Sequence, residues 1–416
     1  MKKTFKLSNE DIESKSENVL ELFYSGIKSD ETKRTMKGNL RVFLEDICAD
    51  IFSGTFEERA QQFVELARKD QEKTIQIILA YVRHLRSRTK LAKNNENYLN
   101  PSTIPNRIKP IKKLLEMNGL GLGWKRIHSS FPELNNIHQG RGYTREEIKT
   151  ILEHSNDVGL DFVILAASSG GLRIGVWENV TWDDVKPVYQ IKDKFTLEEP
   201  EENSKVVCAA MRIYKGTSEE YIALISREAW DKLQEYRKEW IRKAKRKPLD
   251  SDPLLLERYS KLKARSPLSI KKKIERTVIK SGIRSPLTEG KRRYEVPTTH
   301  GFRRYFDKVM MESTKKSDLL SALVKKERLL GHSGLVKTDA NYYWTTIEEL
   351  VPDYLEAMPE ITINNENRLE LEIEKQNQRE ESLKNEITEK EKTMRKVKEL
   401  EAKIIRIEKY QRITSH

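Results

Sequence analysis

Apolar residues recur every three or four positions through the first third of the chain, the spacing of one α-helical face. Three stripes comprise Val42, Phe43, Ile47, Ile51 and Phe52; Phe63, Val64 and Leu66; and Ile75, Ile78, Leu79 and Val82. A fourth runs from Ser102 to Met117, where Asn118-Gly119 is typical of a helix end and Pro110 predicts a kink. We therefore predict a compact helical domain over residues 1–133.

The pattern changes after this domain. Residues 134–142 are rich in asparagine and glycine and predict a linker, and Thr144-Arg-Glu-Glu147 is a capping box that opens a new helix. The second domain, residues 143–363, is predicted to be mostly helical with one non-helical piece. In that piece two β-rich runs, Val206–Ile213 and 221–225, surround a polar turn that contains Lys215, which predicts a β-hairpin.

Residues 364–416 are mostly charged or amide side chains with sparse aliphatic ones. The aliphatic positions follow three- and four-residue steps: Leu369, Ile373, Leu383, Ile387, Met394, Val397, Ile404 and Ile407. This spacing predicts a long helix that can form a coiled coil, although polar residues in the seam leave a solitary helix as the alternative. The predicted fold class is mainly α with a small β-hairpin or sheet.

Charge points to a polyanionic partner. The chain has 416 residues and a formal net charge of +13, and basic surfaces of this kind attract nucleic acid. The basic clusters are Lys33, Arg34, Lys37 and Arg41; Arg83, Arg86, Arg88, Lys90 and Lys93; Lys109, Lys112 and Lys113; and Lys261, Lys263, Arg265, Lys271, Lys272, Lys273 and Arg276. We interpret these clusters as contacts to DNA phosphates, with solvated helix faces as the alternative.

Cysteine usage and hydropathy bear on the compartment. Cys48 and Cys208 are far apart, which excludes a disulfide framework and fits a reducing environment. No segment reaches the ~18 consecutive apolar residues of a membrane span. We expect a soluble cytoplasmic protein without a membrane partner.

Several residues could act on a phosphodiester. Arg173 follows two glycines that we place at a helix start, and Lys215 lies at the hairpin tip. His300 and Arg303 lie one helical turn apart, and arginine suits phosphate because its planar fork stays charged and donates two hydrogen bonds. His332 lies in a Leu-Leu-Gly-His-Ser-Gly turn, and Tyr342-Tyr343-Trp344 follows closely. Each motif alone has a structural explanation, as a surface helix, a turn or core packing.

Together, the order Arg, Lys, His-x-x-Arg, Gly-His, Tyr over residues 141–363 resembles the catalytic half of tyrosine recombinases, the phage-integrase family. The N-terminal domain is similar to the family's core-binding domain in helix content and order. The stretch from Asn341 to Leu355 looks most like archaeal and archaeal-virus integrases.

The resemblance implies roles for individual residues. Arg173 and Arg303 would clamp the phosphate, Lys215 would be the general acid, and His300 and His332 would be the two histidines of the site. Tyr342 would be the nucleophile. Tyr343 is the alternative, because the family's usual position, nine residues after the histidine, is Asn341 here. A second departure is Val176, which stands where the family usually has a carboxylate; the nearest acid is Glu178.

The implied reaction is site-specific recombination of double-stranded DNA through a 3′-phosphotyrosyl intermediate, by a homotetramer assembled on DNA. We expect no cofactor, because no metal or ATP is required. Two alternatives stay open. One is a relaxing enzyme like type IB topoisomerases, which uses nearly the same groups. The other is a DNA-binding protein with a retired active site.

Overall fold

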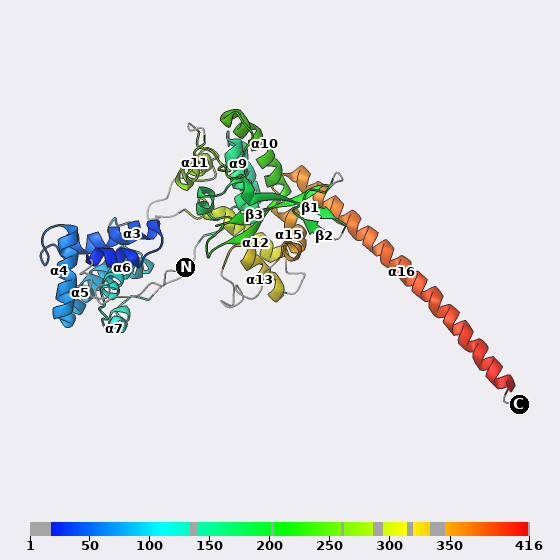
Figure 1. The fold of residues 1–416 in the computed structure, drawn as a ribbon, viewed down its shortest axis with the longest axis horizontal. Coiled ribbons are helices and arrows are strands. Elements are labelled where there is room, and N and C mark those ends of the chain that lie inside the picture. The colour runs from blue at the N-terminus through cyan, green and yellow to red at the C-terminus, as the bar shows by residue number, and fades with distance from the viewer. Residues whose placement is uncertain are drawn as a thin grey trace, which may run out of the picture. The chain divides into compact units, whose positions relative to one another are not determined.

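The computed structural model describes residues 18–133, 140–192, 194–200, 204–258, 262–285, 294–313, 319–332 and 346–414. Two compact units are present: an N-terminal unit within the first 139 residues and a C-terminal unit from Gly140 onward. Both consist mainly of helices, and the C-terminal unit adds one small antiparallel sheet (Figure 1). The predicted fold class is confirmed.

The N-terminal unit is all-helical. Its elements are α2 (Val19–Ser25), α3 (Asp30–Arg41), η1 (Val42–Ile47), α4 (Phe56–Lys69), α5 (Gln71–Thr89), η2 (Pro101–Thr103), α6 (Ile104–Met117) and α7 (Trp124–His128). A capping box formed by Thr55 and Glu58 begins α4. Helix α6 continues through Pro110 and ends at Met117, and Gly119 after it adopts a φ of 75°. The predicted helix end is therefore confirmed.

One apolar stripe was interpreted wrongly. Phe43 and Phe52 are buried as predicted, but Ile47 and Ile51 are 39% and 50% exposed. The reason is that η1 is a π-helical turn, in which the backbone N–H of Cys48 bonds to the carbonyl of Phe43, five residues earlier. The wider turn removes Ile47 and Ile51 from the α-helical face and brings Cys48 into the core instead.

The C-terminal unit is built around one buried helix. Its helical elements are α8 (Arg145–Glu153), α9 (Val158–Gly170), η3 (Ile174–Glu178), η4 (Trp182–Asp184), α10 (Arg227–Ala244), α11 (Pro267–Lys280), α12 (His300–Ser313), α13 (Leu319–Leu329), α15 (Ile347–Ile361) and α16 (Asn365–Thr414). The predicted capping box at Thr144 begins α8. Helix α9 is apolar nearly all round and contacts α10, α12 and the sheet, so it forms the centre of this unit.

The sheet is larger than predicted. Strands β3 (Val206–Ile213) and β4 (Tyr221–Ser226) form the expected hairpin, but β1 (Val185–Ile191) and β2 (Lys194–Thr196) extend the sheet in the order β2-β1-β3-β4. The expectation of a single non-helical piece was therefore wrong. Pro187 obscured β1, because proline is rare inside strands. Here it is tolerated, since β2 pairs only with positions 189–191 and leaves that edge of β1 open at Pro187.

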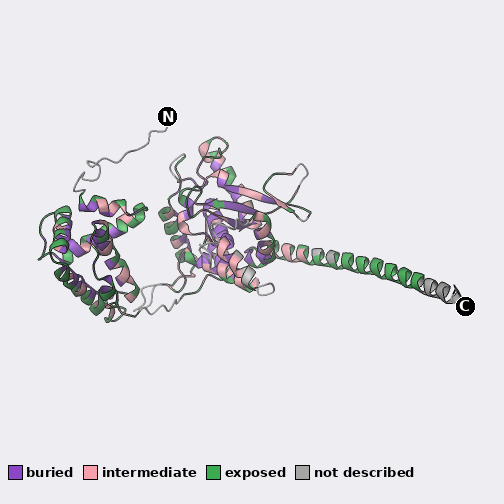
Figure 2. Ribbon diagram, turned by 60° about the horizontal axis from the view of Figure 1, so that its bottom comes forward, coloured by how far each residue is buried: buried purple, intermediate pink, exposed green. Residues whose placement is uncertain are grey.

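Helix α16 changes character along its length. Its first turns are anchored to the C-terminal unit: Glu228 accepts hydrogen bonds from the backbone of Ile363 and Asn364, and Lys375 donates to the carbonyl of Glu356 at 3.0 Å. Beyond residue 376, all of its described side chains are exposed, as the green part of the helix in Figure 2 shows. The first turns pack on α15, and Arg379 still borders a pocket that α16 shares with α12 and α15.

Candidate active site

Arg173 leaves the central helix at a sharp turn. Gly171 ends α9 in the left-handed conformation (φ 62°), and an added Cβ there would lie 2.6 Å from both Leu330 and Phe306. The glycine pair therefore ends a helix, and the expectation that it opens one was wrong, since only the short η3 turn follows. The Arg173 guanidinium reaches toward the Gly331 carbonyl at 3.5 Å.

Arg303 lies on the buried face of α12, one turn after His300. Its guanidinium donates to the carbonyl of Gly171 and, at 2.7 Å, to that of Leu330. These bonds tie the end of α9 to the end of α13, which are distant in sequence. Two predicted arginines thus meet at the same Leu330-Gly331 turn.

His332 completes this cluster. Its Nε2 lies 2.8 Å from a guanidinium nitrogen of Arg303, and its Nδ1 lies 2.5 Å from the carboxylate of Glu327. Because a guanidinium can only donate, Nε2 accepts and Nδ1 donates to Glu327. Gly331 must be a glycine here: its φ is 62°, and a Cβ would lie 2.4 Å from the Tyr221 ring.

The two arginines of this cluster have no carboxylate in direct contact within the described part of the chain. Neither Arg173 nor Arg303 makes an ion pair with any carboxylate in the described part of the chain. The pKa of Arg303 is lowered, first by burial and then by the neighbouring charge of Arg173. The Tyr221 hydroxyl is buried beside them and interacts with the Arg303 guanidinium. Two guanidiniums without a described carboxylate partner fit an anion with several oxygens, such as a phosphodiester.

The surroundings of His300 favour its neutral form. Its pKa is lowered, first because the protein partly shields the ring from water and then because Arg303, Arg304 and Arg173 repel another positive charge. It also begins α12, and the positive end of a helix dipole disfavours an imidazolium. A neutral imidazole can accept a proton, so the surroundings of His300 suit a general base.

Lys215 lies at the tip of the β3–β4 hairpin, after Tyr214 with its positive φ of 54°. Its ammonium forms an ion pair with Asp183 at 2.7 Å and lies 3.8 Å from Asp184. The ion pair with Lys215, supported by Lys186, lowers the pKa of Asp183 to about 2. Lys215 is therefore held by Asp183 and not by the arginine cluster.

The tyrosine that the sequence favours, Tyr342, and its alternative Tyr343 lie outside the described residues. The structure thus brings Arg173, Arg303 and His332 into one cluster and puts His300 within its electrostatic reach. It leaves Lys215 on a neighbouring turn.

Two residues of the cluster were missed in the sequence. Tyr221 begins β4, and its only signal was its place after the hairpin turn. Glu327 provides the carboxylate nearest to His332, whereas Val176, at the family's carboxylate position, is buried and Glu178 is exposed. Nothing in the sequence distinguishes Glu327 from the many other glutamates.

The basic stretch before α11 serves two purposes. Arg265 is buried and, with Lys273, forms ion pairs with the Asp157 carboxylate, which caps the start of α9. The interpretation of these two side chains as DNA contacts is therefore wrong. Lys271, Lys272 and Arg276 remain exposed on α11.

The basic clusters of the N-terminal unit differ in whether their side chains form ion pairs. Lys33, Arg34 and Arg41 pair with acidic side chains of their own helical segment. By contrast, the exposed Arg83, Arg86, Lys90 and Lys93 have no ion-pair partner among the described residues. This second cluster, on and just after α5, has charge available for phosphates.

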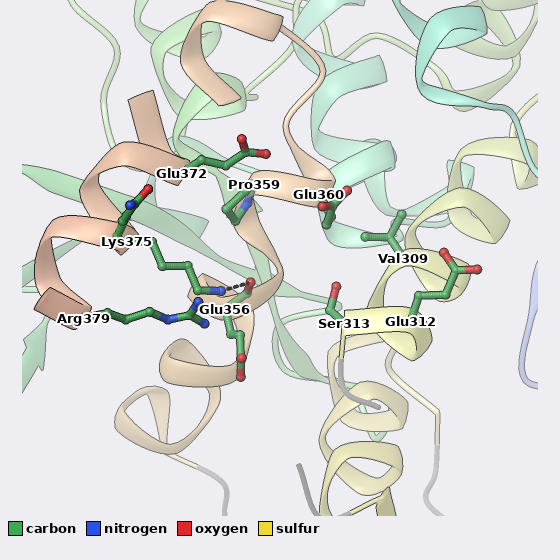
Figure 3. A pocket seen from close by; sticks show the side chains of 10 residues that line it. Val309, Glu312, Ser313, Glu356, Pro359, Glu360, Glu372, Lys375 and Arg379 are labelled. Atoms are coloured by element: carbon green, nitrogen blue, oxygen red, sulfur yellow. Dashed lines mark hydrogen bonds between the residues drawn. The ribbon is translucent and has the colours of Figure 1, made fainter. Parts of the chain in front are cut away.

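A pocket of about 510 Å³ lies elsewhere in the C-terminal unit, between α12, α15 and α16 (Figure 3). Its lining contains Glu312, Glu356, Glu360 and Glu372, with Lys375 and Arg379, and none of the predicted site residues. Because four carboxylates outnumber two cations, the pocket is net acidic and disfavours phosphate, so it does not compete with the arginine cluster as the candidate site. Across the described ranges, no helix is long and apolar enough to cross a membrane.

Comparisons with known proteins give structural neighbours. No protein-family model and no curated protein sequence matches the chain. Solved structures that match include XerA recombinase (16% identity, TM-score 0.33, covering 77% of this chain and 97% of that one). A lambda integrase dimer bound to a COC′ core site matches at 13% identity and a TM-score of 0.39, with 74% and 98% covered.

The Tn1549 transposon integrase matches at 14% identity and a TM-score of 0.43, covering 81% of this chain and 98% of that one. These neighbours are tyrosine recombinases and integrases. Because identities and TM-scores are this low, we base the function on the residues of the chain itself.

Proposed function

We propose that this chain is a site-specific DNA recombinase that cuts and rejoins strands through a tyrosine. The observation that carries the proposal is the pair Arg173 and Arg303, which make no ion pair with a described carboxylate and meet beside His332 at the Leu330-Gly331 turn. Such a site would hold a phosphodiester by its two non-bridging oxygens and stabilise the charge that builds during attack.

Cleavage would begin with the tyrosine hydroxyl. With an ordinary pKa near ~10 it is mostly protonated, so attack needs a base. His300 would accept the proton as the tyrosine oxygen, which we assign to Tyr342, forms a bond to phosphorus. The bond from phosphorus to the 5′ oxygen breaks in the same step.

The leaving oxygen needs a proton, which Lys215 would donate. For this the hairpin tip must exchange the ion pair with Asp183 for contact with DNA. The products are a 3′-phosphotyrosyl bond and a free 5′ hydroxyl. A hydroxyl from another strand reverses the reaction, so resealing requires neither ATP nor a metal.

His332 would add a hydrogen bond to the same phosphate. Its ring lies between Arg303 on Nε2 and the carboxylate of Glu327 on Nδ1, and the two contacts fix its orientation beside the phosphate site.

The domain roles follow from the charge distribution. Residues 1–133 would bind the DNA core site, 143–363 would catalyse, and 134–142 would join them. Residues 364–416, with the exposed part of α16, would hold protomers together, and four protomers would act on two duplexes because four strands are exchanged.

The test uses nicked suicide duplexes that carry the sequence the protein selects from a random duplex library. Wild type should form a covalent adduct that is lost in Tyr342→Phe and kept in Tyr343→Phe. Loss only in Tyr343→Phe would move the nucleophile by one residue.

Two other outcomes would overturn the proposal. Binding without any adduct would indicate a retired site. Relaxation of supercoiled plasmids at many sequences, without recombinant product, would indicate an enzyme like type IB topoisomerases.

A further inference from the structure

The exposed part of α16 carries a heptad seam with charges at fixed places. In the heptad that puts most of the aliphatic residues at positions a and d, the a positions are Ile387, Met394 and Glu401. The d positions are Lys390, Val397 and Ile404, so two of these six seam residues are charged. All six are exposed, with Met394 at 64% and Val397 at 47%. A lone helix gains nothing from such a stripe, so the seam needs a partner.

The charges exclude the simplest pairing. In a parallel, in-register pair with a second copy, Lys390 would face Lys390 and Glu401 would face Glu401 across the buried seam. Glu380 occupies the a position one heptad before Ile387 and would also face its own copy. Like charges at the centre of a coiled coil destabilise it.

Reversing one helix removes each conflict. In antiparallel coiled coils a positions face d positions. With Met394 opposite Val397, Ile387 faces Ile404 and Lys390 faces Glu401, and each contact occurs twice by symmetry. Beside the seam, Glu391 lies next to the partner's Lys398. Sliding one helix by a heptad ruins this match, since Lys390 then faces Met394 or Val397 faces Glu401.

We infer that α16 pairs with α16 of a second copy of this chain as an antiparallel coiled coil centred between Met394 and Val397. The occupant is a second copy because the seam from Ile387 to Ile404 is complementary to itself on reversal. This inference does not depend on the recombinase function, since it rests on the helix alone.

A charge exchange tests the orientation in the full chain. Lys390→Glu and Glu401→Lys each put like charges opposite one another in both symmetric layers, so each should raise the dimer dissociation constant about tenfold or more by sedimentation equilibrium. The double variant Lys390→Glu/Glu401→Lys restores opposite charges and should regain wild-type affinity. Single variants that dimerise like wild type would overturn the antiparallel arrangement, as would a wild-type chain that stays monomeric at micromolar concentration.

Disulfide trapping tests the register. Met394→Cys and Val397→Cys proteins should cross-link under oxidation when mixed and not separately, because residue 394 faces 397 of the other copy. Cys48 and Cys208 are buried and should not interfere. Cross-linking of Val397→Cys alone would show a parallel pair. Cross-linking between Leu383→Cys and Ile387→Cys would show a different antiparallel register, and either result overturns the inference.

Discussion

At the scale of single residues, the candidate site depends on two arginines whose described hydrogen-bond acceptors include no carboxylate. Arg303 is buried against carbonyl groups, which hold its position without neutralising its charge. The same holds for Arg173 at the Gly331 carbonyl. A bound phosphate would supply the negative charge that these carbonyl groups do not.

Glu327 should matter for catalysis although no family pattern singled it out. Glu327→Gln keeps a hydrogen-bonding group near His332 but removes its charge, which is worth about 1–2 kcal/mol in such bonds. We expect the rate of adduct formation on suicide duplexes to fall roughly tenfold while the melting temperature falls by no more than about 2–8 °C, so that the protein stays folded in the assay. Glu312→Gln, an exposed carboxylate at the acidic pocket, is the matched control and should react like wild type. Equal rates in both variants would remove Glu327 from the site.

The pH dependence of cleavage should report His300. A base works only when neutral, and the pKa of His300 lies below its ordinary value. Single-turnover cleavage should therefore persist below pH ~6.5 and decline only as the pH falls through the lowered pKa. Arg304→Gln removes one of the repelling charges, so the acid limb should move to higher pH, while Arg304→Lys should leave it in place. An acid limb that ignores Arg304→Gln would argue against His300 as the base.

At the scale of elements, α9 is the helix to which the site is attached. Asp157 caps its start and pairs with Arg265 and Lys273, while Gly171 ends it beside the arginine cluster. Burial alone would raise the pKa of Asp157, but the two cations hold it far below its usual range. The ion triad thus fixes one end of the helix whose other end delivers Arg173.

Asp157→Asn preserves the cap and leaves Arg265 buried without a countercharge. We expect a loss of about 3 kcal/mol in the free energy of unfolding, seen as a decrease of roughly 6–12 °C in the melting of the C-terminal unit. Asp161→Asn is the matched control on the same helix. Burial raises the pKa of Asp161, so its neutral amide should cost little.

The sign of the pH effect follows from the lowered pKa of Asp157. The ionised Asp157 carboxylate stabilises the fold fully when the pH is above its pKa in the unfolded chain, ~3.9. This stabilisation is lost as the pH falls toward the lower pKa that Asp157 has in the folded protein. The difference between wild type and Asp157→Asn should narrow below about pH 4. A difference that stays constant there would contradict the ion-triad explanation.

At the scale of the whole molecule, the net charge is +13, but the basic side chains differ in how free they are to contact DNA. Some form ion pairs within a helix, and Arg265 is buried in an ion pair with Asp157. Others, on α5 and α11, are exposed. Only the latter can release counterions from DNA on binding.

This division predicts the salt dependence of DNA binding. Arg83→Gln/Arg86→Gln should reduce the slope of log affinity against log salt by ~0.9 for each phosphate that the variant no longer neutralises. Lys33→Gln/Arg34→Gln removes the same formal charge from side chains already paired with Asp30 and Glu31, and should change the slope less. Fluorescence anisotropy over a salt series measures both. Equal slopes in the two variants would show that pairing within α3 does not decide which cations meet DNA.

The sequence by itself determined the features that depend on neighbours a few residues away. The helical stripes after residue 56, the capping box at Thr144, the helix end at Gly119 and the β3–β4 hairpin were predicted, because periodicity and turn chemistry act over one or two turns. The order of Arg173, Lys215, His300, Arg303 and His332 was likewise enough to propose a reaction.

The tertiary structure decided which side chains are partners. Asp157 and Arg265 are 108 residues apart, and Arg173 and Gly331 are 158 apart. Glu327 lies only five residues before His332, but it could not be told from other glutamates because its importance depends on Arg303, which the fold brings to the other side of the imidazole ring. Pro187 and the π turn at Val42 concealed local structure. A side chain's charge is written in the sequence, but whether it is free, paired or buried depends on contacts that only the folded chain creates.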